Sequence, residues 1–380
     1  MLYFDHNAST PLHGEVLDEM MPYLQSNFAN PSSVHQQGRL ARQAIDRARE
    51  QVAALVNAHP SQVIFTSGGS EANNLAISGS VRGMGLSRLM IAATEHPSVR
   101  DTAKQFESSL VLDELKVDSG GVIDKDFFFD KSNSFGQGLV SVMLANNETG
   151  VIQNLNQIGK VAQSHGHVMH TDAVQAAGKI DVDFSALPVN LLTLSAHKIY
   201  GPKGIGALVF DKSIDLMPMI FGGGQERKRR SGTENVAAIA GFGKAAELAL
   251  TNLSNNRTYL LELQNYFENQ LEKITGIIIF SKRETRLPNT TFFGLPGIDG
   301  ESLLMQLDTH GIAVTSGSAC ASTSLKPSHV LLAMGVEVDV ARSAIRVSFG
   351  VENTKAQIDE LIKALYAQQQ LFASLESIEI

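Results

Sequence analysis

The stretch QVIFTSGGSEANNLAISGSV, residues 62–81, indicates the fold. Its apolar beginning predicts a short strand, and the glycine pair that follows predicts a tight turn. A helix is expected to begin at Ser70, with Glu71 in its first turn. A strand, a turn and a helix in direct succession form the unit from which α/β proteins are built.

Strand-like segments of the same kind return five times before residue 211. They are RLMIAAT (88–94), LVSVMLA (139–145), HVMHTDA (167–173), VNLLTLS (189–195) and IGALVF (205–210). Helical segments separate several of them, and another helix is expected over 35–58. Near-continuous apolar strands that alternate with helices predict an α/β fold with a mostly parallel sheet covered on both faces.

The pattern changes after about residue 250. A helix over roughly 256–275 precedes the strand-like segments GIIIFS and NTTFFGL, a glycine- and serine-rich loop, the strand-like segment SAIRVSFG and a final helix. We therefore expect two domains, as is usual for a chain of 380 residues. The predicted large α/β domain spans 14–252, and the smaller α+β domain combines 1–13 with 253–380.

Composition narrows the class of protein. The chain is 43% hydrophobic and 18% charged, as is typical of globular proteins, and its net charge of −8 argues against general nucleic-acid binding. A single cysteine cannot form an internal disulfide, which favours a reducing cytoplasmic location. The N-terminus does not resemble a secretory signal, and no uncharged apolar run approaches the ~18 residues of a membrane helix.

Three polar features follow predicted strands, where ligands of open parallel sheets collect. They are the turn Ser67–Ser70, Asp172 and Lys198. Each has an ordinary explanation taken alone, as a tight turn, a helix N-cap or a solvated lysine. Together they are the parts that pyridoxal 5′-phosphate requires. A lysine forms a Schiff base with it, a carboxylate keeps its ring nitrogen protonated, and a cradle anchors its phosphate.

The motifs around these residues resemble a known family. DHNAST with NPSSVH, FTSGGSEANN, TEHPSV, NNETGVIQ, TDAVQAAGK, SAHKIYGPKGIGAL, RRSGTENV, SGSACAS and IRVSFG occur in this order. They resemble cysteine desulfurases of the NifS/IscS-like branch of the class V aminotransferases, which have the type I fold of enzymes dependent on pyridoxal phosphate. The resemblance spans nearly the entire chain.

The resemblance implies how the cofactor would be anchored. Lys198 would carry it as a Schiff base, and Ser195 and His197 would reach its phosphate. Gly69 and Ser70 would add phosphate contacts from the start of a helix.

Further residues would contact the cofactor ring. Asp172 would pair with its nitrogen, Gln175 would hydrogen-bond its phenolic oxygen, and His96 would stack on it and transfer protons. Asn147 would lie near that oxygen and the substrate carboxylate. Thr233 would reach the phosphate of a neighbouring subunit, which implies a homodimer.

The strand SAIRVSFG contains the expected substrate-binding residue. Ile345, Val347 and Phe349 alternate on one face and leave Arg346 on the other. The alternation alone fits a solvated face equally well. A guanidinium binds the carboxylate of an amino acid in bidentate fashion, and the family motif favours this role for Arg346.

The only cysteine, Cys320, lies in the loop of small residues at about 315–331. A thiol in such a loop suits a nucleophile that must move. The resemblance implies that L-cysteine yields L-alanine and a persulfide on Cys320. An iron–sulfur scaffold or another acceptor protein would then receive the sulfur.

Two alternatives remain at this point. A selenocysteine lyase, or another class V lyase or aminotransferase, would not need Cys320. A catalytically silent binding subunit would not need Lys198, Asp172, His96 and Cys320, and the presence of all four speaks against it.

The histidine-rich segment HGHVMH (165–170) is not expected to bind a metal, because alternation along a strand separates His167 from His170 and no cysteine supports them. The sequence leaves open whether Cys320 transiently ligates an iron cluster with a partner. The basic run ERKRR (226–230) fits a solvated loop or a local anion site.

Overall fold

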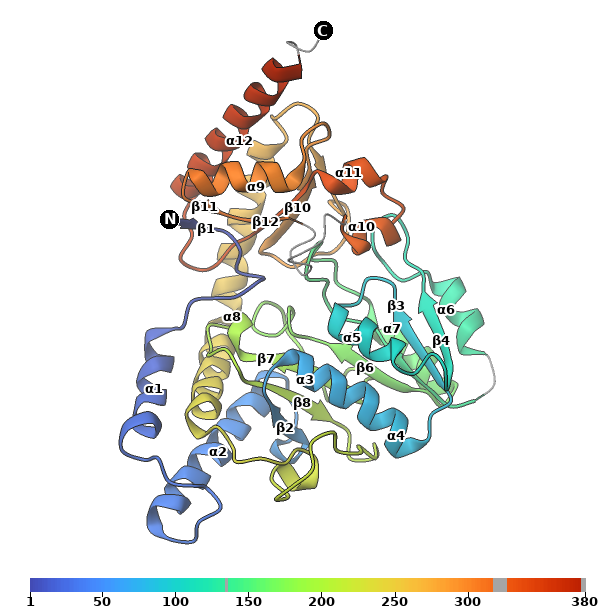
Figure 1. Cartoon of the computed structure of the whole chain (residues 1–380), viewed down its shortest axis with the longest axis vertical. Coiled ribbons are helices and arrows are strands. Elements are labelled where there is room, and N and C mark those ends of the chain that lie inside the picture. Colours follow the sequence, from blue (N-terminus) through green and yellow to red (C-terminus); the bar gives the residue numbers. More distant parts are fainter. Residues whose placement is uncertain (134–135, 317–326, 377–380) are drawn as a thin grey trace.

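The computed structural model of the chain describes residues 1–133, 136–316 and 327–376. Its centre is a seven-stranded sheet (Figure 1). In spatial order the strands are β2 (Val63–Thr66), β8 (Gly206–Phe210), β7 (Leu191–Ser195), β6 (Val168–Asp172), β5 (Gly138–Ser141), β3 (Arg88–Ala92) and β4 (Val111–Leu115). Only β8 runs antiparallel to its neighbours in this sheet. The predicted α/β fold with a mostly parallel sheet is confirmed.

The sheet is covered on both faces, and its residues alternate between two apolar cores. Ile64 and Phe65, neighbours in β2, belong to opposite cores. The helices around the sheet are α1 (Gly14–Gln25), α2 (Gln36–Leu55), α3 (Gly69–Asn74), α4 (Ser80–Met84), α5 (Pro97–Lys104), α6 (Lys125–Ser132) and α7 (Leu155–Ser164). Short helical turns lie at η1 (Pro60–Gln62), η2 (Leu75–Gly79), η3 (Ala196–Lys198) and η4 (Glu226–Lys228).

A smaller antiparallel sheet lies at the other end of the molecule (Figure 1). Its strands are β12 (Thr315–Ser316), β13 (Ala344–Ser348), β10 (Thr290–Gly294) and β9 (Ile278–Ile279). Helices α9 (Gly300–Thr309), α10 (His329–Ala333), α11 (Val338–Arg342) and α12 (Lys355–Glu376) belong to the same half. Strand β1 (Leu2–Tyr3) pairs with β11 (Ile312–Ala313), so the N-terminus joins this half.

One helix connects the two halves. Helix α8 (Val236–Leu271) runs from the half with the large sheet to the half with the small one (Figure 1). It contributes Phe242 to the core of the large sheet and Leu263 to the core of the small one. It begins about 20 residues before the helix expected near 256 and passes through the predicted domain boundary at 252. The segment 244–271 contains neither proline nor glycine, so nothing in it ends the helix. The domain limits themselves stay a prediction.

Within the described ranges, no helix combines the length and the apolar character that a bilayer-spanning segment needs.

Candidate active site

A pocket lies at the carboxyl ends of β6 and β7, beside the start of α3. It is the place where α/β sheets commonly bind ligands. Nearly every predicted cofactor residue lines it, namely Gly69, Ser70, His96, Asn147, Asp172, Gln175, Ser195, His197 and Lys198. Arg346 reaches the same pocket from the small sheet. Thr233 is exposed and does not line it, and Cys320 lies outside the described residues.

The expected phosphate end of the pocket is formed by α3 and the end of β7. A Cβ added to Gly69 would lie 3.0 Å from Val174 Cγ2 and 3.6 Å from Ser195 Cβ, so glycine keeps this corner open. Ser195 Oγ is buried and has no hydrogen-bond partner among the described residues. A buried hydroxyl of this kind normally has a partner, and a phosphate oxygen would supply one.

His197 lies beside this corner. Burial and the neighbouring Lys198 lower the pKa of His197 to about 4. The ring is therefore neutral near pH 7, with one N–H to donate.

Asp172 lies at the end of β6 and is buried. Its Oδ1 accepts a hydrogen bond of 2.9 Å from the Val174 backbone, and its Oδ2 accepts one of 2.7 Å from Asn73 Nδ2. These donors hold the carboxylate at the pocket wall, where it can pair with a protonated ring nitrogen. No sequence pattern predicted a role for Asn73.

His96 caps the N-terminus of α5. Its Nδ1 accepts a 3.1 Å hydrogen bond from the Ser98 backbone, so the neutral ring carries its hydrogen on Nε2. Burial lowers the pKa of His96, Asp172 opposes this effect, and Lys198 adds to it. A neutral imidazole beside Lys198 and Asp172 can stack on a planar ring and exchange protons.

Lys198, at the end of η3, is held by the N-terminal segment. Its Nζ donates hydrogen bonds of 2.6 Å to Asn7 O and 2.8 Å to Ala8 O. Asn7 O also accepts a 2.9 Å hydrogen bond from Gln175 Nε2. In the sequence, Asn7 stands out only as part of the motif DHNAST. Its role has no local signal, because its hydrogen-bond partners follow at least 140 residues later.

Arg346 is held on two sides. Its Nη2 forms a 2.7 Å ion pair with Asp5 Oδ1, and its Nη1 donates a 2.8 Å hydrogen bond to Asn147 O. Its Nε is buried without a partner among the described atoms. The predicted face assignment is confirmed, since Ile345 and Val347 lie in the small core while Arg346 lines the pocket.

Two buried acids lie directly next to site residues. Burial raises the pKa of Glu95 well above its usual value, with Asp172 adding to the effect, and its Oε1 accepts a hydrogen bond from the Met143 backbone. Burial also raises the pKa of Glu148 to about 7, although hydrogen bonding to Ser328 and the charge of Arg346 oppose it. Neither acid was singled out from the sequence.

Basic side chains of the run 226–230 contact other residues of the chain. Arg230 pairs with Glu71 at 2.9 Å, and the Arg229 guanidinium lies 4.6 Å from the centre of the Phe210 ring. These contacts do not favour the alternative of a local anion site.

The histidines of the segment HGHVMH (165–170) also form hydrogen bonds within the chain. His167 Nδ1 accepts from the Gly138 backbone, and His170 lies between Ser141 and Thr193. Among the described residues no group of His, Cys, Asp and Glu is placed to hold a metal ion.

The sequence model of one family, "Aminotransferase class-V", matches residues 2–361. This chain belongs to the class-V aminotransferase family. The cysteine desulfurase IscS of Dictyoglomus turgidum (strain DSM 6724 / Z-1310) is similar to this class-V aminotransferase, with 41% identity over 371 residues that cover 96% of this chain and 93% of that protein.

Solved structures agree with this assignment. A NifS-like protein from Rickettsia africae ESF-5 is 35% identical with a TM-score of 0.88, covering 96% of this chain and 98% of that one. Another NifS-like protein is 33% identical with a TM-score of 0.91, covering 97% of this chain and 99% of that one. The predicted NifS/IscS-like branch and the type I fold are thereby confirmed.

Class-V aminotransferases and cysteine desulfurases depend on pyridoxal 5′-phosphate, and the residues of this pocket fit that group. The corner kept open by Gly69 and the unpartnered Ser195 hydroxyl suit its phosphate. Asp172 suits its ring nitrogen, and Lys198 suits its aldehyde.

Proposed function

We propose that this class-V aminotransferase is a cysteine desulfurase that takes sulfur from L-cysteine, releases L-alanine and holds the sulfur as a persulfide on Cys320. One observation carries the substrate side of the proposal. Arg346, from the small sheet, lines the same pocket as Lys198 and Asp172 from the large one. An amino acid bound by its carboxylate at Arg346 therefore lies within the pocket that contains the reactive lysine. The similarity to a desulfurase named IscS supports the same activity.

Each residue has a distinct task in this proposal. Pyridoxal phosphate supplies a sink for the electrons released when the substrate loses its α-proton. Lys198 would hold the cofactor through its Nζ, and the same amine would accept the α-proton of the substrate. Asp172 would keep the ring nitrogen protonated. His96 would cover the ring and exchange protons there.

Sulfur transfer is assigned to Cys320. Its thiolate attacks the substrate sulfur, so an S–S bond forms as the substrate Cβ–S bond breaks. The electrons of the broken bond stay with the three-carbon fragment, which takes up protons and leaves as alanine. The persulfide then passes to an acceptor protein, either an iron–sulfur scaffold or another thiolation partner.

We also infer a homodimer in which Thr233 completes the phosphate site of the partner. Thr233 is exposed and does not line its own pocket. Beside it, the Ser231 backbone donates a hydrogen bond to Ile220 O, which joins the two segments. Met217, Met219, Ile220 and Phe221 are exposed there, and an apolar patch of this kind suits a second copy of the chain. A cytoplasmic location stays a prediction.

The alternative activity is that of a selenocysteine lyase or another class-V lyase or aminotransferase. Purified protein loaded with pyridoxal phosphate distinguishes the possibilities. We expect the wild type to show a visible absorbance band and to form alanine from L-cysteine. Lys198→Ala should abolish the band. Cys320→Ala should keep the band but form no alanine. Full alanine formation by Cys320→Ala would favour the lyase. If the wild type shows no absorbance band, the remaining alternative is a catalytically silent binding subunit.

A further inference from the structure

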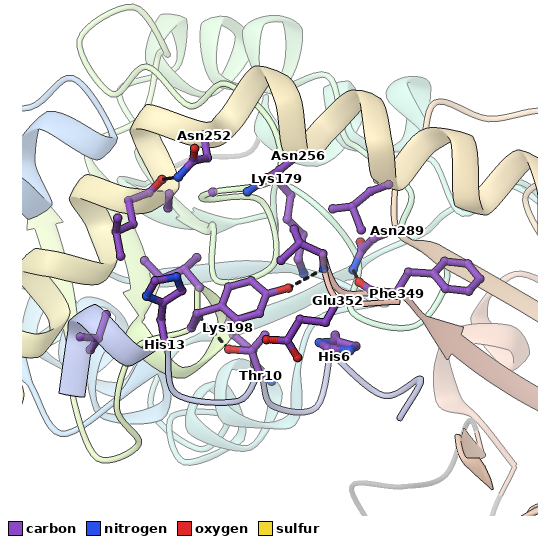
Figure 2. Close-up of a pocket in the computed structure, with 18 residues that line it drawn as sticks. His6, Thr10, His13, Lys179, Lys198, Asn252, Asn256, Asn289, Phe349 and Glu352 are labelled. Atoms are coloured by element: carbon purple, nitrogen blue, oxygen red, sulfur yellow. Dashed lines mark hydrogen bonds between the residues drawn. The ribbon is translucent and has the colours of Figure 1, made fainter. Parts of the chain in front are cut away.

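A second buried lysine lies close to the cofactor site. Lys179 is 6% exposed and follows the turn after β6. Its Nζ donates a 2.8 Å hydrogen bond to Gln175 Oε1 and a 3.0 Å hydrogen bond to Asn7 Oδ1. Figure 2 shows Lys179 and Lys198 among the residues of a second pocket, which Lys198 shares with the pocket of the site.

Both ends of the Gln175 amide are held by this arrangement. Lys179 donates to Oε1, and Nε2 donates a 2.9 Å hydrogen bond to Asn7 O. A flipped amide would set its N–H groups against those of Lys179 and its oxygen against Asn7 O. The contacts therefore fix the orientation of the Gln175 amide.

The orientation matters because Nε2 carries two hydrogens. One is used by Asn7 O, and the other is available to an oxygen in the pocket that Gln175 lines. The proposed acceptor, the phenolic oxygen of the cofactor, can be bonded only by this end of the amide.

The same amine also orders the N-terminal segment. Asn7 Oδ1 accepts from Lys179 Nζ and, at 3.1 Å, from Asn289 Nδ2, while Asn7 Nδ2 donates to Thr290 Oγ1 at 2.8 Å. Both acceptors of Lys179 are neutral, and burial together with Lys198 and Arg346 holds the pKa of Lys179 well below its usual value. Even an uncharged amine has the two hydrogens that these bonds need.

We propose that Lys179 is a positioning residue that fixes the amide of Gln175 for the phenolic oxygen of the cofactor. The inference rests on the proposed cofactor role of Gln175. Lys179 makes no contact with the cofactor itself in this proposal and acts through the side chain that does.

The test measures cofactor binding to the apoenzyme in four proteins: wild type, Lys179→Met, Gln175→Ala and the double variant. Each is titrated with pyridoxal phosphate to obtain a dissociation constant and the absorbance maximum of the bound cofactor. Lys179→Met is expected to weaken binding about tenfold and to shift the maximum in the same direction as Gln175→Ala. Lys160→Met, at an exposed lysine, is the matched control and should change neither quantity.

Coupling between the two residues decides the outcome. Because Lys179 acts through Gln175, Lys179→Met should change binding by no more than about twofold when Gln175 is already alanine. Fully additive losses, or a Lys179→Met protein with wild-type binding and spectrum, would overturn the inference. A wild-type protein that does not bind pyridoxal phosphate would instead refute the proposed function.

Two further variants separate positioning from folding. Lys179→Arg keeps the hydrogen-bond donors, and the adjoining pocket has room for the larger side chain. The absorbance spectrum of this variant should therefore be closer to that of the wild type than the spectrum of Lys179→Met is. If Lys179→Met does not fold, as judged by circular dichroism, Lys179→Gln replaces it. Its amide ends one bond short of Nζ, so the same loss and the same coupling are expected. Wild-type values for Lys179→Gln would contradict the inference.

Discussion

Asn73 Nδ2 donates a 2.7 Å hydrogen bond to Asp172 Oδ2. The same nitrogen lies 2.9 Å from Ser98 Oγ, which lies 2.8 Å from His96 Nδ1. One buried amide thus connects the proposed partner of the ring nitrogen with the histidine expected to stack on the ring.

Asn73→Ala is expected to weaken binding of pyridoxal phosphate by roughly tenfold, because a hydrogen bond to a charged group contributes about 1.5–3 kcal/mol. Fluorescence titration of the apoenzyme measures this loss. Asn74→Ala is the control, since Asn74 is the neighbouring amide and its side chain bonds Ser70 O. Equal effects of the two variants would contradict a specific role for Asn73.

Arg346→Ala is expected to raise KM for L-cysteine by roughly 10- to 100-fold, because the substrate carboxylate loses its charged donor. Steady-state alanine formation measures KM and kcat separately. The matched control is Arg342→Ala, an exposed arginine whose ion pair with Asp339 spans 3.8 Å. An unchanged KM in Arg346→Ala would show that the carboxylate binds elsewhere.

Because of Glu148, we expect the free energy of unfolding to fall as pH rises. The folded protein keeps the Glu148 proton up to a pKa of about 7, whereas the unfolded chain releases it near 4.5. Between these values the folded state binds more protons, so this contribution is present at low pH and is lost as pH rises through about 7. The loss is on the order of 3 kcal/mol.

Glu148→Gln removes this titration and should flatten the dependence of stability on pH. Urea unfolding at about pH 5 and about pH 8 compares the two proteins. The exposed Glu337→Gln serves as the control and should behave as the wild type does. A pH dependence that persists in Glu148→Gln would assign the effect to other groups.

Phe221→Asp is expected to separate the proposed dimer into monomers. Phe221 is 74% exposed, and a charge in a subunit contact would be buried without a partner. Analytical ultracentrifugation measures the association, and Phe129→Asp, at another exposed aromatic residue, should leave it unchanged. If Thr233 completes the partner's site, the monomer should also lose cofactor affinity, as Thr233→Ala does. A wild-type monomer that binds cofactor fully would contradict both expectations.

Most of the large sheet could be predicted because its central strands are buried on both faces and therefore read as continuous apolar runs. Strand β4 was missed. It lies at the edge of the sheet, and its sequence VLDEL is partly exposed and charged, so it lacks that signal. Helix α8 was predicted too short, because its first half is packed against the large core and carries no separate amphipathic pattern.

Site residues could be predicted where a reactive side chain lies at or just after the end of a strand. Asp172 and Lys198 are two such residues. Asn7 and Lys179 were not assigned roles. The hydrogen bond from Lys179 to Gln175 is local, but Asn7 joins these two residues only after the N-terminal segment has folded over η3 and the end of β13. A local pattern contains no trace of a hydrogen bond between residues that are 172 positions apart.

The most direct test of the account is the intact mass of the cofactor-loaded protein after brief exposure to L-cysteine, with alanine measured in the same sample. The account predicts that the wild type gains the mass of one sulfur atom and forms alanine, while Cys320→Ser does neither. Alanine from both proteins without a sulfur adduct would contradict the assignment of Cys320 as the sulfur acceptor and favour the lyase.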